Sequence, residues 1–315
     1  MQSENDQQSV TKQANATPEN ADADVSQFNA YRPLLFSIAY RMLGSVADAE
    51  DMLQETFIRW QRASRADIQS RRAYLVTIIS RLCINHLESA RVRREEYVGH
   101  WLPEPVITAP DESPFSLTHI DESVSMAFLV LLERLTPIER AVFLLRDVFE
   151  YDYAEIAQIL AKDPAHCRQI LHRARQHVAE LRTRFEVSPQ DHDRLLTEFL
   201  QAASTGDLDH LVSILSTDAI LHSDGGGKGP AVPNLVHGSV NVARAILGAS
   251  QKLVPRNLVN RIVRINGVPG LVSYQGGQPY AVLTLEIAHG RIKTIYIISN
   301  KDKLAHLPAL PSAPC

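Results

Sequence analysis

The segment LTPIERAVFLLRDVFEYDYAEIAQILAKDPAHCRQILHRARQHV, residues 135–178, carries the start signals of three successive helices. Residues 136–139 combine a capping threonine, a proline at the first helical position and a glutamate at the third. Asp152 and Glu155 form a second capping box, and Asp163-Pro164 opens the third helix. About three residues separate the second helix from the third, a spacing typical of a helix-turn-helix.

The third of these helices combines an apolar stripe with a basic face. Residues 162–184 have a net charge of +4, and the stripe begins at Cys167, Ile170 and Leu171. A recognition helix presents its polar face to base edges, so Arg168 is predicted to read guanine and Gln169 adenine. A helix of an ordinary bundle would show the same stripe, and this alternative stays open. The candidate DNA-facing residues are Ala165, His166, Arg168, Gln169, His172, Arg173 and Arg175.

A second basic segment lies further upstream, from Arg59 to Arg94. It holds nine arginines against two acidic residues, a net charge of +7. Such local density favours a phosphate backbone, and interspersed Tyr74 and Asn85 suit unpaired bases. The alternative is a solvated helical face. Apolar residues at helical spacing predict a helix before Gly44, a second helix capped by Ser45, and a third from about residue 71.

The remaining chain divides into a linker and a different kind of domain. Residues 95–125 hold four prolines and seven acidic residues but no lysine or arginine, which predicts an extended acidic linker. Helices are expected at 191–203, 208–215 and 239–251. Strands at 260–265, 271–274, 280–288 and 291–299 are expected to form an antiparallel meander. Helices followed by a curled sheet predict an α+β domain with a cavity-forming shape.

Two of these segments resemble one protein family. Residues 31–60, YRPLLFSIAYRMLGSVADAEDMLQETFIRW, resemble region two of the sigma-70 family in its extracytoplasmic-function (ECF) form. Residues 135–160 with CRQILHRARQHV resemble region four of the same family. The resemblance implies binding to core RNA polymerase, through the beta-prime clamp helices and the beta flap, and to promoter DNA. A departure is Ala161-Lys162-Asp163, which occupies a turn where the family often has glycine.

The resemblance also implies roles for individual residues. The helix from residue 163 to 176 matches the part that reads the −35 element. The segment that docks on polymerase matches Asp48, Asp51, Gln54, Glu55 and Trp60. The part that melts and reads the −10 element matches a set that comprises Arg62, Arg65, Arg71, Arg72, Tyr74, Arg81, Asn85, Arg91, Arg93 and Arg94.

Three short motifs occur in order: WLPEP at 101–105, DGGGK at 224–228 and NKDKL at 300–304. They resemble the ECF subgroup with a fused C-terminal SnoaL-like domain, although Lys301 stands where that subgroup usually has proline. A nucleotide-binding loop is disfavoured, because Lys228 is followed by glycine and proline rather than serine or threonine. We expect the linker to pack on the C-terminal domain; a mobile glycine turn is the alternative. The predicted interdomain residues are Trp101, Leu102, Pro103, Asp224, Gly225, Gly226, Gly227, Lys228, Asn300, Asp302, Lys303 and Leu304.

The resulting prediction is a multidomain chain with two all-α sigma domains followed by an α+β SnoaL-like cone. Its expected parts are a disordered tail (1–24), region two (25–95), the acidic linker (96–123), region four (124–187), the SnoaL-like domain (190–306) and a second tail (307–315).

The sequence also disfavours several other classes. Cys83, Cys167 and Cys315 are far apart, which indicates a reducing cytosol and neither disulfides nor a metal site. The polar N-terminal segment is no signal peptide, and no apolar run is long enough for a membrane span. We therefore predict a cytoplasmic protein that is not an enzyme and uses no cofactor.

Two alternatives stay open: a helix-turn-helix regulator with a ligand-binding C-terminal domain, and a SnoaL-like enzyme using Asp218, His222, Asp224 or His237. A small-molecule ligand of the C-terminal domain is a related expectation. The sequence leaves open whether that domain inhibits or assists transcription.

Overall fold

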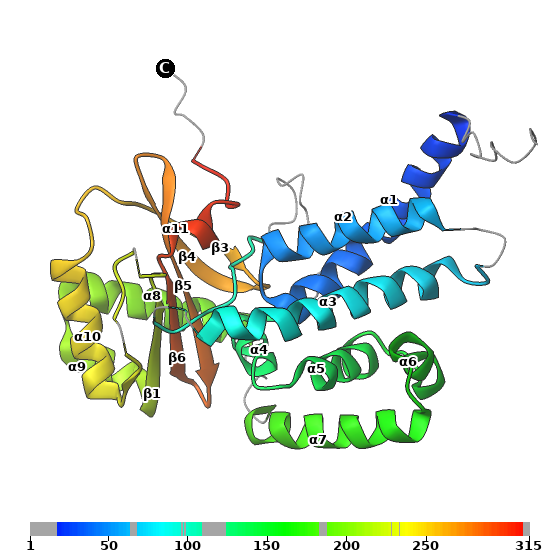
Figure 1. The fold of residues 1–315 in the computed structure, drawn as a ribbon. Coiled ribbons are helices and arrows are strands. Elements are labelled where there is room, and N and C mark those ends of the chain that lie inside the picture. The colour runs from blue at the N-terminus through cyan, green and yellow to red at the C-terminus, as the bar shows by residue number, and fades with distance from the viewer. Residues whose placement is uncertain are drawn as a thin grey trace, which may run out of the picture.

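The protein folds into two helical regions and a C-terminal α+β domain that lie side by side in this computed structural model (Figure 1). The structure describes residues 18–63, 68–95, 97, 99–108, 124–182, 188–227, 229–232 and 234–310. None of the described helices combines the length and the apolar composition that crossing a lipid bilayer requires.

The first helical region comprises α1 (Pro18–Leu43), α2 (Val46–Arg62) and α3 (Arg71–Glu95). Gly44 ends α1 with a φ of 68°, and Ser45 caps α2 by accepting a hydrogen bond from the Asp48 amide, as predicted. The predicted tail is too long, because α1 already begins at Pro18; residues 1–17 lie outside the described residues.

The second helical region comprises α4 (Met126–Leu132), α5 (Pro137–Phe143), the π-helical turn η3 (Leu144–Val148), α6 (Tyr153–Leu160) and α7 (Pro164–Arg182). Both predicted capping boxes are present, at Thr136 with Glu139 and at Asp152 with Glu155. Ala161 ends α6 in the left-handed conformation with a φ of 51°, where a glycine would carry no Cβ penalty.

The two helical regions are not separate bodies. Buried residues of α1, α2 and α3 form one continuous apolar cluster with those of α4 to α7. In Figure 1, α3 lies between α2 and the helices of the second region, and it packs on both α5 and α6. The two helical regions therefore share one hydrophobic core.

In its described residues, the C-terminal domain contains four helices and six strands. The helices are α8 (Pro189–Thr205), α9 (Leu208–Ile214), α10 (Ser239–Lys252) and α11 (Lys301–Leu304). The strands are β1 (Leu215–Asp224), β2 (Val236–His237), β3 (Val259–Ile265), β4 (Val268–Gln275), β5 (Gln278–Ala288) and β6 (Arg291–Ile298).

The sheet has the order β2-β1-β6-β5-β4-β3. The meander from β3 to β6 is antiparallel as predicted, but β1 runs parallel to β6, so the whole sheet is mixed. The sequence prediction missed β1, because its first residues continue the apolar spacing of α9. Leu215 ends that helical spacing and already pairs with Ile292 of β6.

The two faces of the sheet have different neighbours. Helices α8 to α10 cover one face, where Leu195 and Phe199 pack with Leu285 and Ile295. The other face packs against the linker and the second helical region, through Leu102, Met126 and Ala127. Leu307 belongs to this second cluster, so the predicted tail from residue 307 is wrong at its start. The C-terminal domain thus holds the linker and α4 in one apolar contact.

Candidate functional site

The three sequence motifs converge on Asp224, at the end of β1. Its carboxylate is buried and accepts hydrogen bonds from the Leu102 amide (2.9 Å), the Gly226 amide (3.0 Å) and the Lys303 ammonium (2.7 Å). Tyr97 donates a fourth, of 2.6 Å. A buried carboxylate with this many donors, one of them charged, has the partners that desolvation demands.

Lys303 is the second centre of this cluster. Its ammonium donates to the Leu102 carbonyl and lies 4.2 Å from the centroid of the Trp101 ring and 5.1 Å from that of Tyr97. Two aromatic faces around a desolvated ammonium stabilise it further. Lys301, two residues earlier, is exposed. The motif therefore has one lysine that holds the linker and one that faces solvent.

The glycine loop is shaped by the approach of Asn300. A Cβ on Gly226 would lie 2.3 Å from Asn300 Nδ2, and one on Gly229 would lie 2.3 Å from the Ser299 carbonyl oxygen. Asn300 in turn donates to Tyr97 and caps α11. The loop therefore consists of glycine because the end of β6 passes directly over it.

The other predicted members of the cluster differ in their exposure to solvent. Leu102, Pro103, Gly225 and Leu304 are buried, whereas Gly227 and Asp302 are exposed. Lys228 lies outside the described residues. Tyr97 was not predicted; its position four residues before the WLPEP motif in an acidic segment was the available signal. Burial, followed by the hydrogen bond to Asp224, raises the pKa of Tyr97.

The linker continues from this cluster onto the first helical region. Glu104 accepts hydrogen bonds from the Val46 amide (2.7 Å) and the Ser45 hydroxyl (3.0 Å), so its carboxylate lies at the N-terminus of α2. The Glu104 amide donates to the Gly44 carbonyl (2.8 Å). A Cβ on Gly44 would lie 2.7 Å from the Trp101 ring. Trp101 and Glu104 of the linker thus contact the turn between α1 and α2.

Asn266 connects that turn to the sheet. It is fully buried, donates to the Tyr40 hydroxyl (2.7 Å) and exchanges hydrogen bonds with the Val106 backbone. Tyr40 also donates to the Glu104 carbonyl (2.6 Å). Asn266 falls between two predicted strands, and sequence reasoning assigned no role to it, to Tyr40 or to Glu104. The first helical region, the linker and the C-terminal domain are therefore joined by polar as well as apolar contacts.

Two of the candidate DNA-contacting arginines of α3 contact the second helical region. Arg81 donates to the carbonyls of Ile159 (2.8 Å) and Gln158 (3.2 Å) at the end of α6. Arg72 lies over the ring of Tyr151, 5.1 Å from its centroid. Both side chains therefore contact the second helical region, although both are also exposed to solvent.

The other residues of this set are placed as follows. Arg62, Arg71 and Asn85 are exposed, and Tyr74 is half-buried beside Trp60. Arg65 lies outside the described residues, as do the side chains of Arg91, Arg93 and Arg94.

The predicted reading face of α7 is open. All seven candidates on it are exposed, while Cys167, Ile170 and Leu171 are buried as predicted. Arg175 forms a two-pronged ion pair with Asp147 (2.6 and 3.0 Å), and Arg168 lies over Tyr153. Among the described residues, none forms a hydrogen bond or an ion pair with the Arg173 side chain. The candidate face of α7 is therefore exposed to solvent in this structure.

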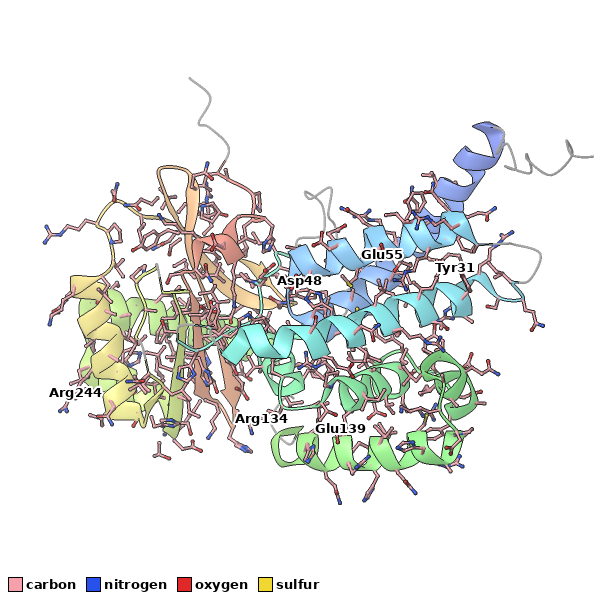
Figure 2. The ribbon with its side chains drawn as sticks, in the orientation of Figure 1. Tyr31, Asp48, Glu55, Arg134, Glu139 and Arg244 are labelled. Atoms are coloured by element: carbon pink, nitrogen blue, oxygen red, sulfur yellow. The ribbon has the colours of Figure 1, made fainter. Side chains whose placement is uncertain are left out.

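The predicted polymerase-docking face of α2 is also open, with one correction. Asp51 and Gln54 are exposed, and Asp48 and Glu55 are half-buried on the side away from α5 and α7 (Figure 2). Trp60 is only 1% exposed, so it supports α2 from within the core and contacts no docking partner in this arrangement.

The four candidate enzyme residues do not share one site, although His237 of β2 lies near enough to His222 for its charge to act on it. Asp218 pairs with Lys293 and Asp224 belongs to the linker cluster. His222 lies beside Tyr296, and burial followed by the charges of His100, His237 and Arg134 lowers its pKa to about 4. Among the described residues, no three metal-ligating side chains gather at one point.

Comparison with known proteins gives a consistent result. Sigma-70 region 2 matches residues 27–93 and sigma-70 region 4 matches residues 125–178. The ECF RNA polymerase sigma factor SigJ of Mycobacterium tuberculosis is 36% identical over 296 residues, which cover 90% of this chain and 94% of that protein. The probable ECF RNA polymerase sigma factor SigI of the same species is 32% identical, over 90% of this chain and 95% of that protein.

The structural comparison agrees. The crystal structure of Mycobacterium tuberculosis SigJ superposes with a TM-score of 0.73 and 35% identity, over 89% of this chain and 98% of that one. The similarity therefore extends through both helical regions and into the C-terminal domain.

Proposed function

The chain belongs to the ECF sigma factors, which bind core RNA polymerase and promoter DNA, and from that premise we propose that its own C-terminal domain holds it in a closed, resting form. In this form, the domain fixes the linker and α4, and the second helical region covers part of the −10-reading helix α3. Opening would release α3 for the unpaired strand and leave α7 to read the −35 element.

The observation that carries this proposal is the contact between α3 and α6. Arg81, a candidate −10 residue, donates both of its described hydrogen bonds to α6 carbonyls. The two promoter elements are centred about 25 base pairs apart, or about 85 Å at 3.4 Å per base pair. Helices in direct contact cannot lie on both elements at once. Promoter binding by both regions therefore requires them to separate.

The C-terminal domain opposes that separation through its contacts with both partners. Leu102 of the linker and Met126 of α4 are buried in the same apolar cluster on the sheet. Lys303 and Asp224 hold the Leu102 backbone from both sides. Weakening this cluster would free the linker and α4 together and shift the population toward the open form.

The test is run-off transcription with purified core polymerase on pooled genomic fragments, comparing Lys303→Met with Lys301→Met. Lys303 is buried in the cluster and Lys301 is exposed, so the second variant is a matched control in the same motif. We expect discrete transcripts from all three proteins and several-fold more from Lys303→Met. Equal output from the two variants would contradict a resting form held by the C-terminal domain, and so would a fall in output with polymerase binding retained.

A further inference from the structure

Strand β3 forms one edge of the sheet, and only the end of its outer side has a partner among the described residues. Ile107 of the linker bridges Ile265 in the antiparallel direction, and the Thr108 amide donates to the Arg264 carbonyl (2.9 Å). Over residues 259–263, none of the described residues pairs with this outer side. We call this stretch the open edge, because a further strand can extend the sheet there.

The hydrogen bonds of the linker show which backbone groups of β3 point outward. The Asn266 amide and the Arg264 carbonyl both bond to the linker, on the outer side of the strand. In an antiparallel ladder, every second residue directs its amide and carbonyl to the same side. Ile262 and Asn260 therefore direct theirs outward as well, and among the described residues none bonds to these groups. The open edge thus offers two residues with donors and acceptors for a strand.

The side chains of the open edge and its surroundings are apolar and basic. Val259 is 49% exposed and Ile262 is 57% exposed, more than any other large apolar side chain in the described part of the chain. Arg256 and Arg261 are exposed beside them. Residues 225–285 hold six basic residues and no acidic one, although the whole chain has a net charge of −4. A partner that combines apolar side chains with carboxylates would complement this edge.

Three other occupants match the open edge less well. Two copies of this chain paired edge to edge would bring Arg256 and Arg261 of both copies together, and like charges in paired strands are destabilising. The chain's own linker bonds at Thr108, but in the same register Pro110 would face Ile262, and proline has no amide to donate. A DNA backbone would match the basic residues but not the exposed apolar ones.

We propose that the open edge of β3 binds an extended acidic segment of another protein, which adds a seventh strand to the sheet. The main chain of this segment would bond to Asn260 and Ile262. Successive side chains of a strand point to opposite faces, so its carboxylates would face Arg261 and its apolar side chains would face Ile262. The proposal adds a partner to the transcription function, and it rests neither on the resting form nor on promoter binding.

The test measures the binding of three fluorescein-labelled hexapeptides to the full chain by fluorescence anisotropy. EVEVEV carries carboxylates on one face of a strand and valines on the other, KVKVKV reverses the charge, and EPEPEP keeps the carboxylates but lacks alternate amides. We expect EVEVEV to saturate one site per chain and KVKVKV not to bind. EPEPEP should bind at least about fivefold more weakly, since the loss of one net hydrogen bond gives about that ratio.

Variants of the chain locate the site. Arg261→Glu reverses a charge at the open edge, so it should weaken EVEVEV binding roughly fivefold and allow KVKVKV to bind, a gain that misfolding would not produce. Arg244→Glu makes the same change at an exposed position of α10 (Figure 2) and should alter neither. Ile262→Pro removes an outward amide and should weaken EVEVEV binding about fivefold, with Ile262→Val as its control.

Several results would overturn the proposal. EVEVEV that does not saturate would do so, as would equal binding of EVEVEV and EPEPEP, because charge alone would then explain the contact. Duplex affinity that falls with Arg261→Glu but not with Arg244→Glu would assign the open edge to DNA. Peptide binding that appears only after Asp111→Asn and Glu112→Gln would assign it to the chain's own linker, and a dimer that Ile262→Pro dissolves would assign it to a second copy. None of these measurements depends on the transcription assay.

Discussion

Helices α3 and α7 are both arginine-rich and both resemble DNA-reading elements, but their arginine side chains have different contacts in the structure. On α7 every candidate residue is exposed. On α3, Arg72 and Arg81 are engaged with the second helical region. Arg168 and Arg175 of α7 also have partners, Tyr153 and Asp147, but these lie within the second helical region itself. The contacts of Arg72 and Arg81 instead cross from the first helical region to the second. If α7 binds duplex DNA and α3 the unpaired strand, as we propose, the two binding activities should respond separately to perturbation.

The largest expected effect comes from Asp224→Asn. The substitution leaves the Lys303 ammonium buried without its counter-charge, which should cost about 3–5 kcal/mol of unfolding free energy. Urea unfolding would measure this loss, with exposed Asp209→Asn as the control. If the closed form covers α3, the variant should also bind single-stranded DNA more tightly at unchanged duplex affinity. A parallel rise in both affinities would remove the distinction between the two helices.

The second largest expected effect is a loss of folding stability at acidic pH, which depends on His222. Its folded pKa is about 4, below the value of about 6.5 in an unfolded chain, so the unfolded state binds the proton first as pH falls. The stability contributed by the neutral imidazole is thus complete above pH 6.5 and lost toward pH 4, by on the order of 3 kcal/mol.

Thermal melts across this pH range would measure the loss, and His222→Gln should flatten the curve between pH 6.5 and 4. An unchanged slope in the variant would assign the pH dependence to other groups.

Arg173 and Arg175 provide a test within α7 alone. Arg175 is held by Asp147, whereas Arg173 extends from the exposed face. Arg173→Ala should weaken duplex binding by about 1–3 kcal/mol if it contacts a base, or reduce the salt slope by about 1 if it contacts a phosphate. Fluorescence anisotropy with genomic duplexes at several salt concentrations would measure both. Arg175→Ala should have the smaller effect on DNA; the reverse order would show that the Asp147 pair opens on binding.

The smallest expected effect is a gain in stability. Ala161 has a φ of 51°, and its Cβ costs roughly 1–2 kcal/mol in that conformation, offset in part by the chain entropy of glycine. Ala161→Gly should therefore raise the unfolding free energy by about 0.5 kcal/mol. Ala154→Gly, inside α6, should lower it by a similar amount. A loss at both positions would show that the turn before α7 tolerates alanine without strain.

Local patterns in the chain were sufficient to predict most helices. The capping boxes at Thr136 and Asp152, the stop at Gly44 and the stripe on α7 act within a few residues, so their physics is visible in the sequence. β1 was missed for the opposite reason. Its residues pair with residues of β6 that lie 74 to 77 positions further along the chain, and its own first residues continue a helical pattern.

Some features of this protein could be predicted from the sequence, and others became visible only in the folded structure. Motif order in the chain was sufficient for the family resemblance, the positions of the two arginine-rich helices and the choice of the three short motifs, because these depend on residue type and local spacing. The fold alone placed Tyr97 on Asp224, Glu104 on the start of α2 and Arg81 on α6. These contacts join residues separated by 58 to 127 positions, and such distances in sequence are closed only by packing of the whole chain.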